Sequence, residues 1–103
     1  MINNNRLALH EKLVEILGSN NVYFQPPSTL KMNYPAIVYS RDDIENTNAD
    51  NLVYKQSVRY QIILIDKSPT SQFLDPISKL PMCSYERGYQ FDNLNHDSFI
   101  IYI

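Results

Sequence analysis

One stretch decides the fold of this 103-residue chain: Tyr54-Lys-Gln-Ser-Val-Arg-Tyr-Gln-Ile-Ile-Leu-Ile-Asp66. Apolar and polar residues alternate through its first half, and this period of two indicates a β-strand with one solvated face. The apolar side consists of Val58, Tyr60, Ile62 and Leu64. Ile63 and Ile65 then make the second face apolar too, so we expect the end of the strand to be covered on both sides. At about 3.3 Å per residue the stretch spans roughly 40 Å, which predicts the central strand of a sheet.

A partner for this strand precedes it in the chain. Pro35 opens an apolar stretch, residues 36–40, which residues 41–44 continue as a more polar strand, and proline is tolerated where a strand begins. Residues 45–51 are rich in Asn and Asp, which favour turns. The simplest topology is a long antiparallel hairpin, in which strands 36–44 and 52–65 flank a polar loop. Its outer half is polar on one face, so we expect it to protrude as a mobile arm or a docking surface.

Two helices are expected beside this hairpin. The first begins at an N-cap supplied by Asn3, Asn4 or Asn5 and ends at about Leu17, with Gly18 in the C′ position. Its apolar arc comprises Leu9, Leu13, Val14, Ile16 and Leu17, with Leu7 at the margin and Glu11, Lys12 and Glu15 opposite. That pattern is typical of a helix lying on a sheet.

The second helix is expected after the central strand. Thr70 or Ser71 can cap it, and it runs to about Leu80. Pro76 is tolerated only in the first turn of a helix, so we expect a delayed or kinked start. An alternative start has Asp75 as the N-cap and Pro76 as the first helical residue.

The remaining strands are shorter. Residues 22–24 predict a short strand or an extended piece, and the following segment 25–28, which contains Pro26 and Pro27, is expected at an edge or on the surface. Residues 82–91 alternate again, with one face formed by Cys83, Tyr85, Arg87, Tyr89 and Phe91. A four-residue turn, 92–95, leads to a last strand, 96–103, whose end is apolar on both faces and must be interior or covered. The fold class that follows is α+β in a single domain, 1–103, with two helices packed on a mostly antiparallel sheet and a long protruding β-hairpin.

Composition excludes several classes of protein. The hydrophobic fraction is 44%, the charged fraction is 19% and the net charge is −2, so the chain is globular and lacks the basic surplus that nucleic-acid binding needs. Cys83 is the single cysteine, which rules out an intramolecular disulfide and fits a reducing cytoplasm. We expect no signal peptide and no membrane span. Eight tyrosines without a tryptophan fit a partner surface or simply strand propensity.

Few residues are candidates for chemistry. His10 lies in the apolar arc of the first helix, and His96 lies at a junction of turn and strand, so both favour structural roles. Cys83 is expected to be a buried, inert thiol. Asp42 and Asp43 do not predict a metal site, because adjacent residues of a strand point to opposite faces. We therefore expect neither a cofactor nor a catalytic set, although a small hydrolase built on carboxylates that the sequence does not reveal stays an alternative.

Three stretches carry a resemblance to a known family. They are Tyr34-Pro-Ala-Ile-Val-Tyr39, Tyr60-Gln-Ile-Ile-Leu-Ile-Asp-Lys-Ser-Pro69 and Arg87-Gly-Tyr-Gln-Phe-Asp-Asn-Leu-Asn-His-Asp-Ser-Phe-Ile-Ile-Tyr102. Together they resemble the small tail-terminator and tail-completion proteins of tailed bacteriophages. The resemblance implies a homo-oligomeric ring, typically a hexamer, that caps the tail tube and meets the head-completion or connector protein. It implies a place in the neck of the virion, after assembly in the host cytoplasm, and no catalytic residues.

The residues themselves predict where such subunits meet. A ring needs two unlike surfaces on each copy, and arginine beside tyrosine is favoured in interface cores. The predicted interface residues are Arg41, Asp43, Tyr54 and Arg59 on the hairpin, with Arg87 and Tyr89 on the later strand. The competing interpretation is a cytoplasmic adaptor or inhibitor that binds one protein partner as a monomer through the same hairpin.

Overall fold

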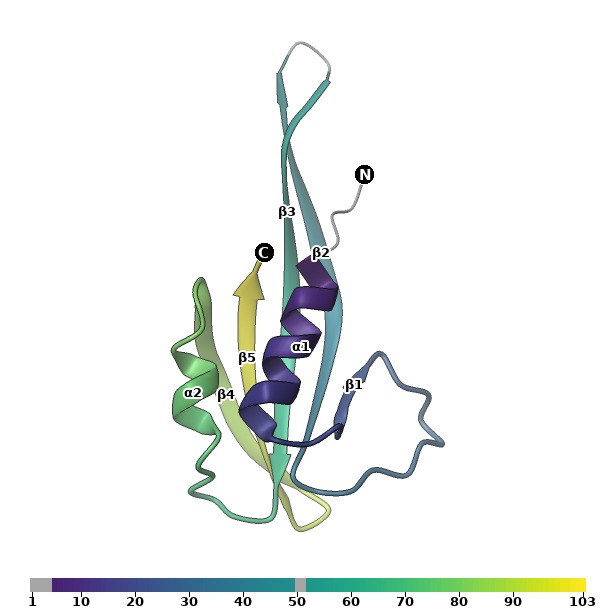
Figure 1. The fold of residues 1–103 in the computed structure, drawn as a ribbon, viewed down its shortest axis with the longest axis vertical. Coiled ribbons are helices and arrows are strands. Elements are labelled where there is room, and N and C mark those ends of the chain that lie inside the picture. The colour runs from purple at the N-terminus through teal and green to yellow at the C-terminus, as the bar shows by residue number, and fades with distance from the viewer. Residues whose placement is uncertain (1–4, 50–51) are drawn as a thin grey trace.

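The structure, a computed structural model, describes residues 5–49 and 52–103, with side chains described for 5–46 and 56–103. Two helices and a five-stranded mixed sheet confirm the α+β class (Figure 1). In chain order the elements are α1 (Asn5–Leu17), β1 (Val22–Phe24), β2 (Ala36–Ala49), β3 (Leu52–Asp66), α2 (Leu74–Ser78), β4 (Cys83–Phe91) and β5 (Leu94–Tyr102). Within the described residues, no helix is long and apolar enough to cross a membrane.

The strands lie in the order β1-β2-β3-β5-β4, so the prediction that β3 is the central strand is confirmed. Three of the four pairings are antiparallel. The exception is β1, which pairs in parallel with β2 from Val22 opposite Ile37 to Phe24 opposite Tyr39. A parallel connection must carry the chain back along the length of the strand, which explains the long excursion of residues 25–35 at that edge (Figure 1).

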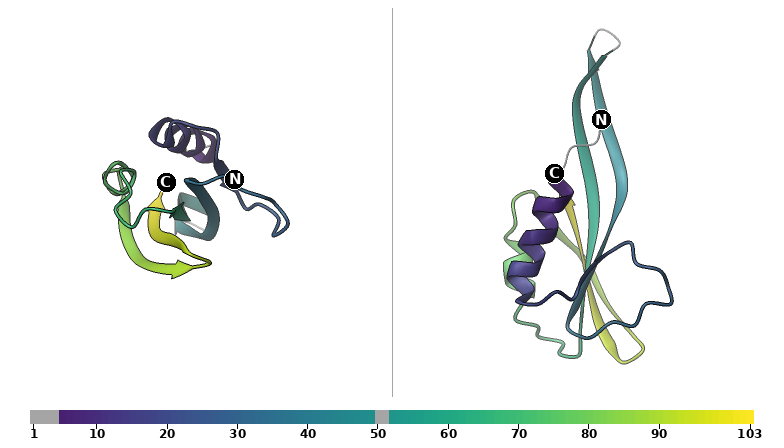
Figure 2. Two further views of the ribbon diagram at one scale, coloured as in Figure 1. Left: turned by 90° about the horizontal axis from the view of Figure 1, so that it is seen from below. Right: turned by 45° about the vertical axis from the view of Figure 1, so that its right-hand side comes forward.

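One face of the sheet, which we call the helix face, carries the core. The alternating residues Val58, Tyr60, Ile62 and Leu64 are all buried there, as predicted. Both helices contribute to the same cluster, through Leu9, Leu13 and Leu17 from α1 and Ile77 from α2. Figure 2 shows the two helices on the same side of the twisted sheet. The opposite face, which we call the open face, has no described helix over it.

Helix α1 follows its predicted pattern. Leu13 is fully buried while Leu7, at the margin of the arc, is 57% exposed. Gly18 ends the helix with a φ of 74°, and its N–H donates to the Val14 carbonyl at 2.8 Å. Glycine adopts that left-handed conformation without the steric penalty of a side chain. Two of the predicted caps, Asn3 and Asn4, lie outside the described residues.

Helix α2 is shorter than predicted. It begins at Leu74, after Phe73 in the N-cap position, and no side chain caps it. Neither Thr70 nor Ser71 caps the helix, and the alternative with Asp75 as the N-cap is also wrong. Pro76 is the third residue of the helix, where its missing N–H would have no partner within the helix, so the expected delayed start is confirmed.

The loop predicted over residues 45–51 is wrong. β2 continues to Ala49 and pairs with β3 as far as Leu52, so the strands take up most of that segment. Backbone hydrogen bonds in a ladder do not require apolar side chains, and polar pairs such as Gln56 with Asn46, joined at 3.1 Å, line up across the strands. The ladder between β5 and β3 runs from Arg59 to Asp66, and Ile103 exchanges two backbone hydrogen bonds of 3.0 Å with Val58; among the described residues, no third strand pairs with β2 and β3 beyond that point.

A β-bulge corrects the predicted face of β4. Tyr85 lies opposite Phe99 and Arg87 lies opposite Ser98, so Glu86 is an extra residue. One inserted residue reverses the alternation beyond it. Cys83 and Tyr85 therefore share the helix face with Phe99, whereas Arg87, Tyr89 and Phe91 lie on the open face. The sequence pattern had placed all five on one face.

The turn between β4 and β5 is also tighter than predicted. Phe91 pairs with Leu94, so the loop consists of Asp92 and Asn93 alone, with φ values of 55° and 61°. Two successive residues with positive φ form the type I′ turn that suits the twist of a hairpin, and Asp and Asn tolerate it better than most residues. The last strand, β5, is interior as expected, with Phe99 and Ile101 buried.

Candidate subunit interface

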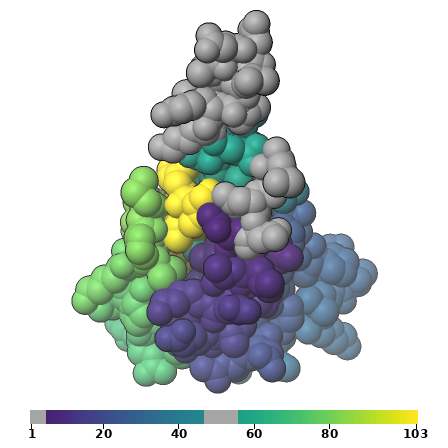
Figure 3. Space-filling view, turned by 45° about the horizontal axis from the view of Figure 1, so that its top comes forward, coloured from purple at the N-terminus to yellow at the C-terminus, as the bar shows by residue number. Residues whose placement is uncertain are grey.

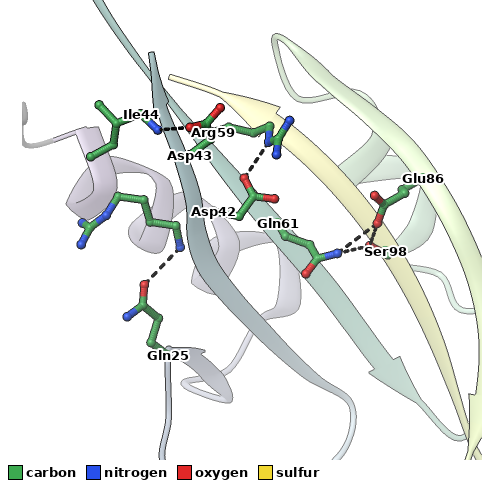
Figure 4. A network of polar contacts seen from close by, with 9 residues as sticks. Gln25, Asp42, Asp43, Ile44, Arg59, Gln61, Glu86 and Ser98 are labelled. Carbon is green, nitrogen blue, oxygen red and sulfur yellow. Dashed lines mark hydrogen bonds and ion pairs between the residues drawn. The ribbon is translucent and has the colours of Figure 1, made fainter. Parts of the chain in front are cut away.

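The first group of predicted interface residues lies where β2 and β3 pass the end of β5. A second bulge occurs here, because Arg41 pairs with Tyr60 while Asp43 pairs with Arg59, and Asp42 is the extra residue. The bulge brings the side chains of Asp42 and Asp43 to Arg59 on the open face (Figure 4). The expectation that these two carboxylates point to opposite faces is therefore wrong.

Arg59 is fixed within its own chain by Asp42. Its Nε donates to Asp42 Oδ1 at 2.6 Å, and both side chains are about one-third exposed. That hydrogen bond is the main reason that the pKa of Arg59 lies above its ordinary value, so the guanidinium is charged at every physiological pH. Asp43 does not join the ion pair; its Oδ1 accepts from the backbone N–H of Ile44 at 2.9 Å. Asp43 is exposed.

Arg41 and Tyr54 differ from the other predicted residues on these strands. Arg41 is exposed, and by its pairing with Tyr60 it belongs to the helix face, opposite to Arg59. Its backbone N–H is held by Gln25 Oε1 at 3.2 Å. Tyr54 belongs to β3, but its side chain lies outside the described residues. The bulge therefore divides the predicted set between the two faces of the sheet.

The second group lies on the β4–β5 hairpin, and we call it the hairpin cluster: Arg87, Tyr89, Phe91 and His96. The rings of Tyr89 and His96 stack with centroids 4.9 Å apart and planes 13° apart, and the Arg87 guanidinium lies 5.4 Å from the Tyr89 ring centroid. Phe91 meets His96 edge-on at 6.3 Å. Phe91 is nevertheless 70% exposed and Tyr89 is 41% exposed, which is unusual for aromatic rings that are already stacked.

Between the two groups a polar network ties the three strands β3, β5 and β4 together. Glu86 Oε1 accepts from Ser98 Oγ at 2.6 Å and from Gln61 Nε2 at 3.0 Å (Figure 4). Hydrogen bonds from Ser98 and then Gln61 lower the pKa of Glu86 below its ordinary value. The bulge makes this possible, because it brings Glu86 to the open face beside Ser98. The network holds the edge strand β4 in place relative to the central strand.

The reactive side chains are engaged in structural contacts. His10 Nδ1 lies 2.7 Å from the Tyr39 hydroxyl, which also accepts from Arg6 at 3.2 Å. His96 Nδ1 donates to the Leu94 carbonyl at 3.2 Å, as its position after the turn predicted. Burial raises the pKa of the Cys83 thiol, which makes it a poor nucleophile at neutral pH. In the part of the chain that the structure describes, His, Cys, Asp and Glu form no group of three that could hold a metal ion.

Four residues were not among the predicted interface residues: Asp42, Phe91 and His96 of these two groups, and Glu86 of the network between them. Asp42 and Glu86 are the extra residues of the two bulges, and no local sequence pattern predicts a bulge. His96 had a signal, because a two-residue turn at Asp92-Asn93 places it directly opposite Tyr89. Reading the turn as four residues hid that pairing.

Comparison with known proteins adds no family: no protein-family model matches the chain, and no curated protein matches it.

Proposed function

We propose that this chain is a structural subunit of the neck of a tailed bacteriophage, a tail terminator or tail-completion protein. Copies assemble into a closed ring, a hexamer, that caps the tail tube and joins it to the head-completion or connector protein. The subunit works in the virion after assembly in the host cytoplasm, recognises no nucleic-acid sequence, and catalyses no reaction.

One observation carries this proposal: the molecule has two unlike uncovered surfaces on different parts of its sheet. One is the distal part of β2 and β3, which passes beyond β5 and carries Asp43 and Arg59 at its base. The other is the hairpin cluster on the edge strand β4. A head-to-tail contact between unlike surfaces repeats with every added copy and closes into a ring when the rotation allows it.

The two surfaces also suit each other chemically. We propose that the distal part acts as a projecting arm, with the exposed charge of Asp43 at its base and the exposed charge of Arg41 on the other face, where β2 and β3 still lie beside β5. The hairpin cluster offers exposed aromatic rings beside the charge of Arg87. Arginine and tyrosine dominate the binding energy of protein interfaces, since both combine a large apolar area with directional polar groups.

Charge reversal tests the interface that we propose. Arg87→Glu changes the hairpin cluster, and we expect native mass spectrometry to show rings for the parent chain and monomers for this variant. Lys12→Glu is the matched control, because Lys12 is exposed on α1 and is distant in sequence from both surfaces. If both variants assemble as the parent does, the hairpin cluster is not a subunit contact. A parent chain that forms only a 1:1 complex with one partner would favour the monomeric adaptor instead.

A further inference from the structure

The segment of residues 30–34 has the alternation of a β-strand but no strand to pair with. It reads Leu30-Lys-Met-Asn-Tyr34, apolar at every second position. Met32 and Tyr34 are half-buried whereas Lys31 and Asn33 are exposed. The Leu30 N–H closes a turn onto the Pro27 carbonyl at 3.1 Å, and the backbone N–H groups of residues 31–34 donate to no other described residue. The parallel connection explains the length of this excursion but not its alternating pattern.

An unpaired strand also exists at the other edge of the sheet. β4 is bonded to β5 along one side only, and it is exposed along almost its whole length. Exposed edge strands are commonly made short or interrupted by proline to prevent unwanted pairing. The β1 edge has both protections, because β1 has three residues and Pro26 and Pro27 follow it. Beyond its bulge, from Arg87 to Phe91, β4 has neither.

These two features lie on opposite sides of the molecule. Figure 1 shows the 25–35 excursion beyond β2 and shows β4 at the far edge, and Figure 3 shows the excursion as a blue lobe that projects from one flank of the body. Strands in a sheet are about 4.8 Å apart, so roughly 19 Å separates β1 from β4. Within one chain the segment cannot reach the strand, so only a second copy can bring them together.

We propose that residues 30–34 of one copy add to β4 of the next copy as a sixth strand. With Met32 opposite Tyr89, the apolar positions Leu30 and Tyr34 fall beside Arg87 and Phe91 on the open face. Side chains directly opposite each other on neighbouring strands share a face, so in either strand direction this register puts Met32 on the Tyr89 ring, one outer apolar residue on the Phe91 ring and the other on the stem of Arg87.

The other face is equally complementary. Lys31 and Asn33 then lie beside Gly88 and Gln90, where hollows of about 300 and 440 Å³ are lined by polar groups that include Asn95 and Asp97. Asp97 accepts from the Tyr85 hydroxyl through Oδ1 at 2.9 Å, and its negative charge suits an incoming lysine. Gly88 leaves that space open, since a Cβ there would lie 2.6 Å from the Tyr85 hydroxyl and 3.0 Å from Asp97 Oδ1.

This pairing rests on the proposed ring and adds its backbone contact. Each copy gives one segment and receives one, so the contact is heterologous and propagates from copy to copy. Added strands gain affinity from backbone hydrogen bonds and specificity from alternate side chains, and both are available here.

Disulfide cross-linking tests the pairing directly. In a Cys83→Ser background, Met32→Cys and Tyr89→Cys are combined in one chain and oxidised at high protein concentration. We expect a ladder of covalent dimers and higher oligomers on a non-reducing gel, because opposed residues bring Cα atoms within the roughly 7 Å that a disulfide allows. A matched pair, Met32→Cys with Gln90→Cys, points to opposite faces and should stay monomeric. Each single-cysteine variant alone should also give no ladder, while an equimolar mixture of the two should stop at dimers.

A second measurement uses no engineered cysteine. Met32→Asp places a charge on the apolar side of the segment, and we expect it to weaken self-association at least tenfold in analytical ultracentrifugation. Asn33→Asp adds the same charge on the polar side and serves as the control. Equal effects of the two variants would overturn the proposed register.

The outcomes separate this inference from the ring itself. Closed rings in native mass spectrometry without the Met32–Tyr89 cross-link would overturn the strand addition and leave the ring standing. A cross-linked ladder of open chains would support the strand addition and contradict the closed ring. A chain that stays monomeric at every concentration and gives no ladder would overturn both.

Discussion

Glu86 determines which side chains of β4 reach the open face of the sheet. As the extra residue of the bulge, it reaches Ser98 and Gln61 on the open face. The same insertion moves Arg87 and Tyr89 to that face, away from the core, and so creates the hairpin cluster. A single residue thus converts part of an apolar strand face into an exposed aromatic surface.

The carboxyl of Glu86 should titrate below its ordinary pKa of about 4.5. The hydrogen bonds favour the charged form in the folded state, so the stabilisation is present above the unfolded-state pKa and is lost as the pH falls through the lower, folded-state value. Carboxyl NMR should show this depressed pKa, and Ser98→Ala should raise it. A Glu86 that titrates at or above 4.5 in the parent chain would show that the network does not form.

The ion pair between Asp42 and Arg59 should contribute little to stability. Both partners are partly solvated, and solvent screens an exposed ion pair. In a double-mutant cycle followed by urea unfolding, the effects of Asp42→Ala and Arg59→Ala on stability should therefore be nearly additive. A large coupling energy between the two substitutions would contradict this prediction. It would mean that the ion pair stabilises the fold, which would explain its presence without any role in an interface.

At the scale of elements, α1 holds the sheet through a narrow set of contacts. Leu9, Leu13 and Leu17 are buried against the helix face, whereas the polar side of the helix is exposed. Helix α2 is short because Pro76 and Pro81 leave room for little more than one helical turn. The buried Ile77 anchors that turn to the core.

Two leucines on α1 give a matched pair for this packing. Leu13→Ala removes a fully buried side chain and should lower the free energy of unfolding by about 3–5 kcal/mol. Leu7→Ala, at a position 57% exposed, should change it by less than about 0.5 kcal/mol. Urea unfolding followed by circular dichroism measures both. Similar losses for the two variants would contradict the assigned face of the helix.

The β4–β5 turn permits a second comparison. Asn93 has a φ of 61°, which an ordinary side chain adopts at a cost of about 1–2 kcal/mol. Asn93→Ala should therefore lower the melting temperature, whereas Asn93→Gly should leave it unchanged or raise it. Calorimetry on the two variants decides the matter. If alanine were tolerated as well as glycine, the two-residue turn would be incorrect.

For the whole molecule, the sequence predicts the elements well and their exact pairing less well. The alternation from Val58 to Leu64 identifies the central strand because burial on one face leaves a direct periodic trace. The bulges at Asp42 and Glu86 leave none, since each depends on how two strands meet and not on either strand alone. The helix that Pro76 delays was anticipated, but its start was not, because no side-chain cap marks it.

The same holds for the candidate interface: residue types could be predicted from the sequence, but the contacts that depend on strand pairing could not. Arg87 and Tyr89 were predicted from their residue types, and their stacking with His96 depends on a two-residue turn that the sequence analysis took as four residues. Asp43 and Arg59 stay predictions as interface residues, and the ion pair of Arg59 is made by the neighbouring Asp42. Which surface meets which in an assembly is a property of two molecules, and a single sequence carries it only indirectly.

The most direct test of the central claim is electron microscopy of the purified chain, alone and with isolated tail tubes of the cognate phage. We predict annular particles with a central hole and six-fold symmetry, free in solution or seated on tube ends. A chain that stays a monomer at high concentration and leaves the tube ends bare would contradict the ring, and with it the role proposed for both surfaces.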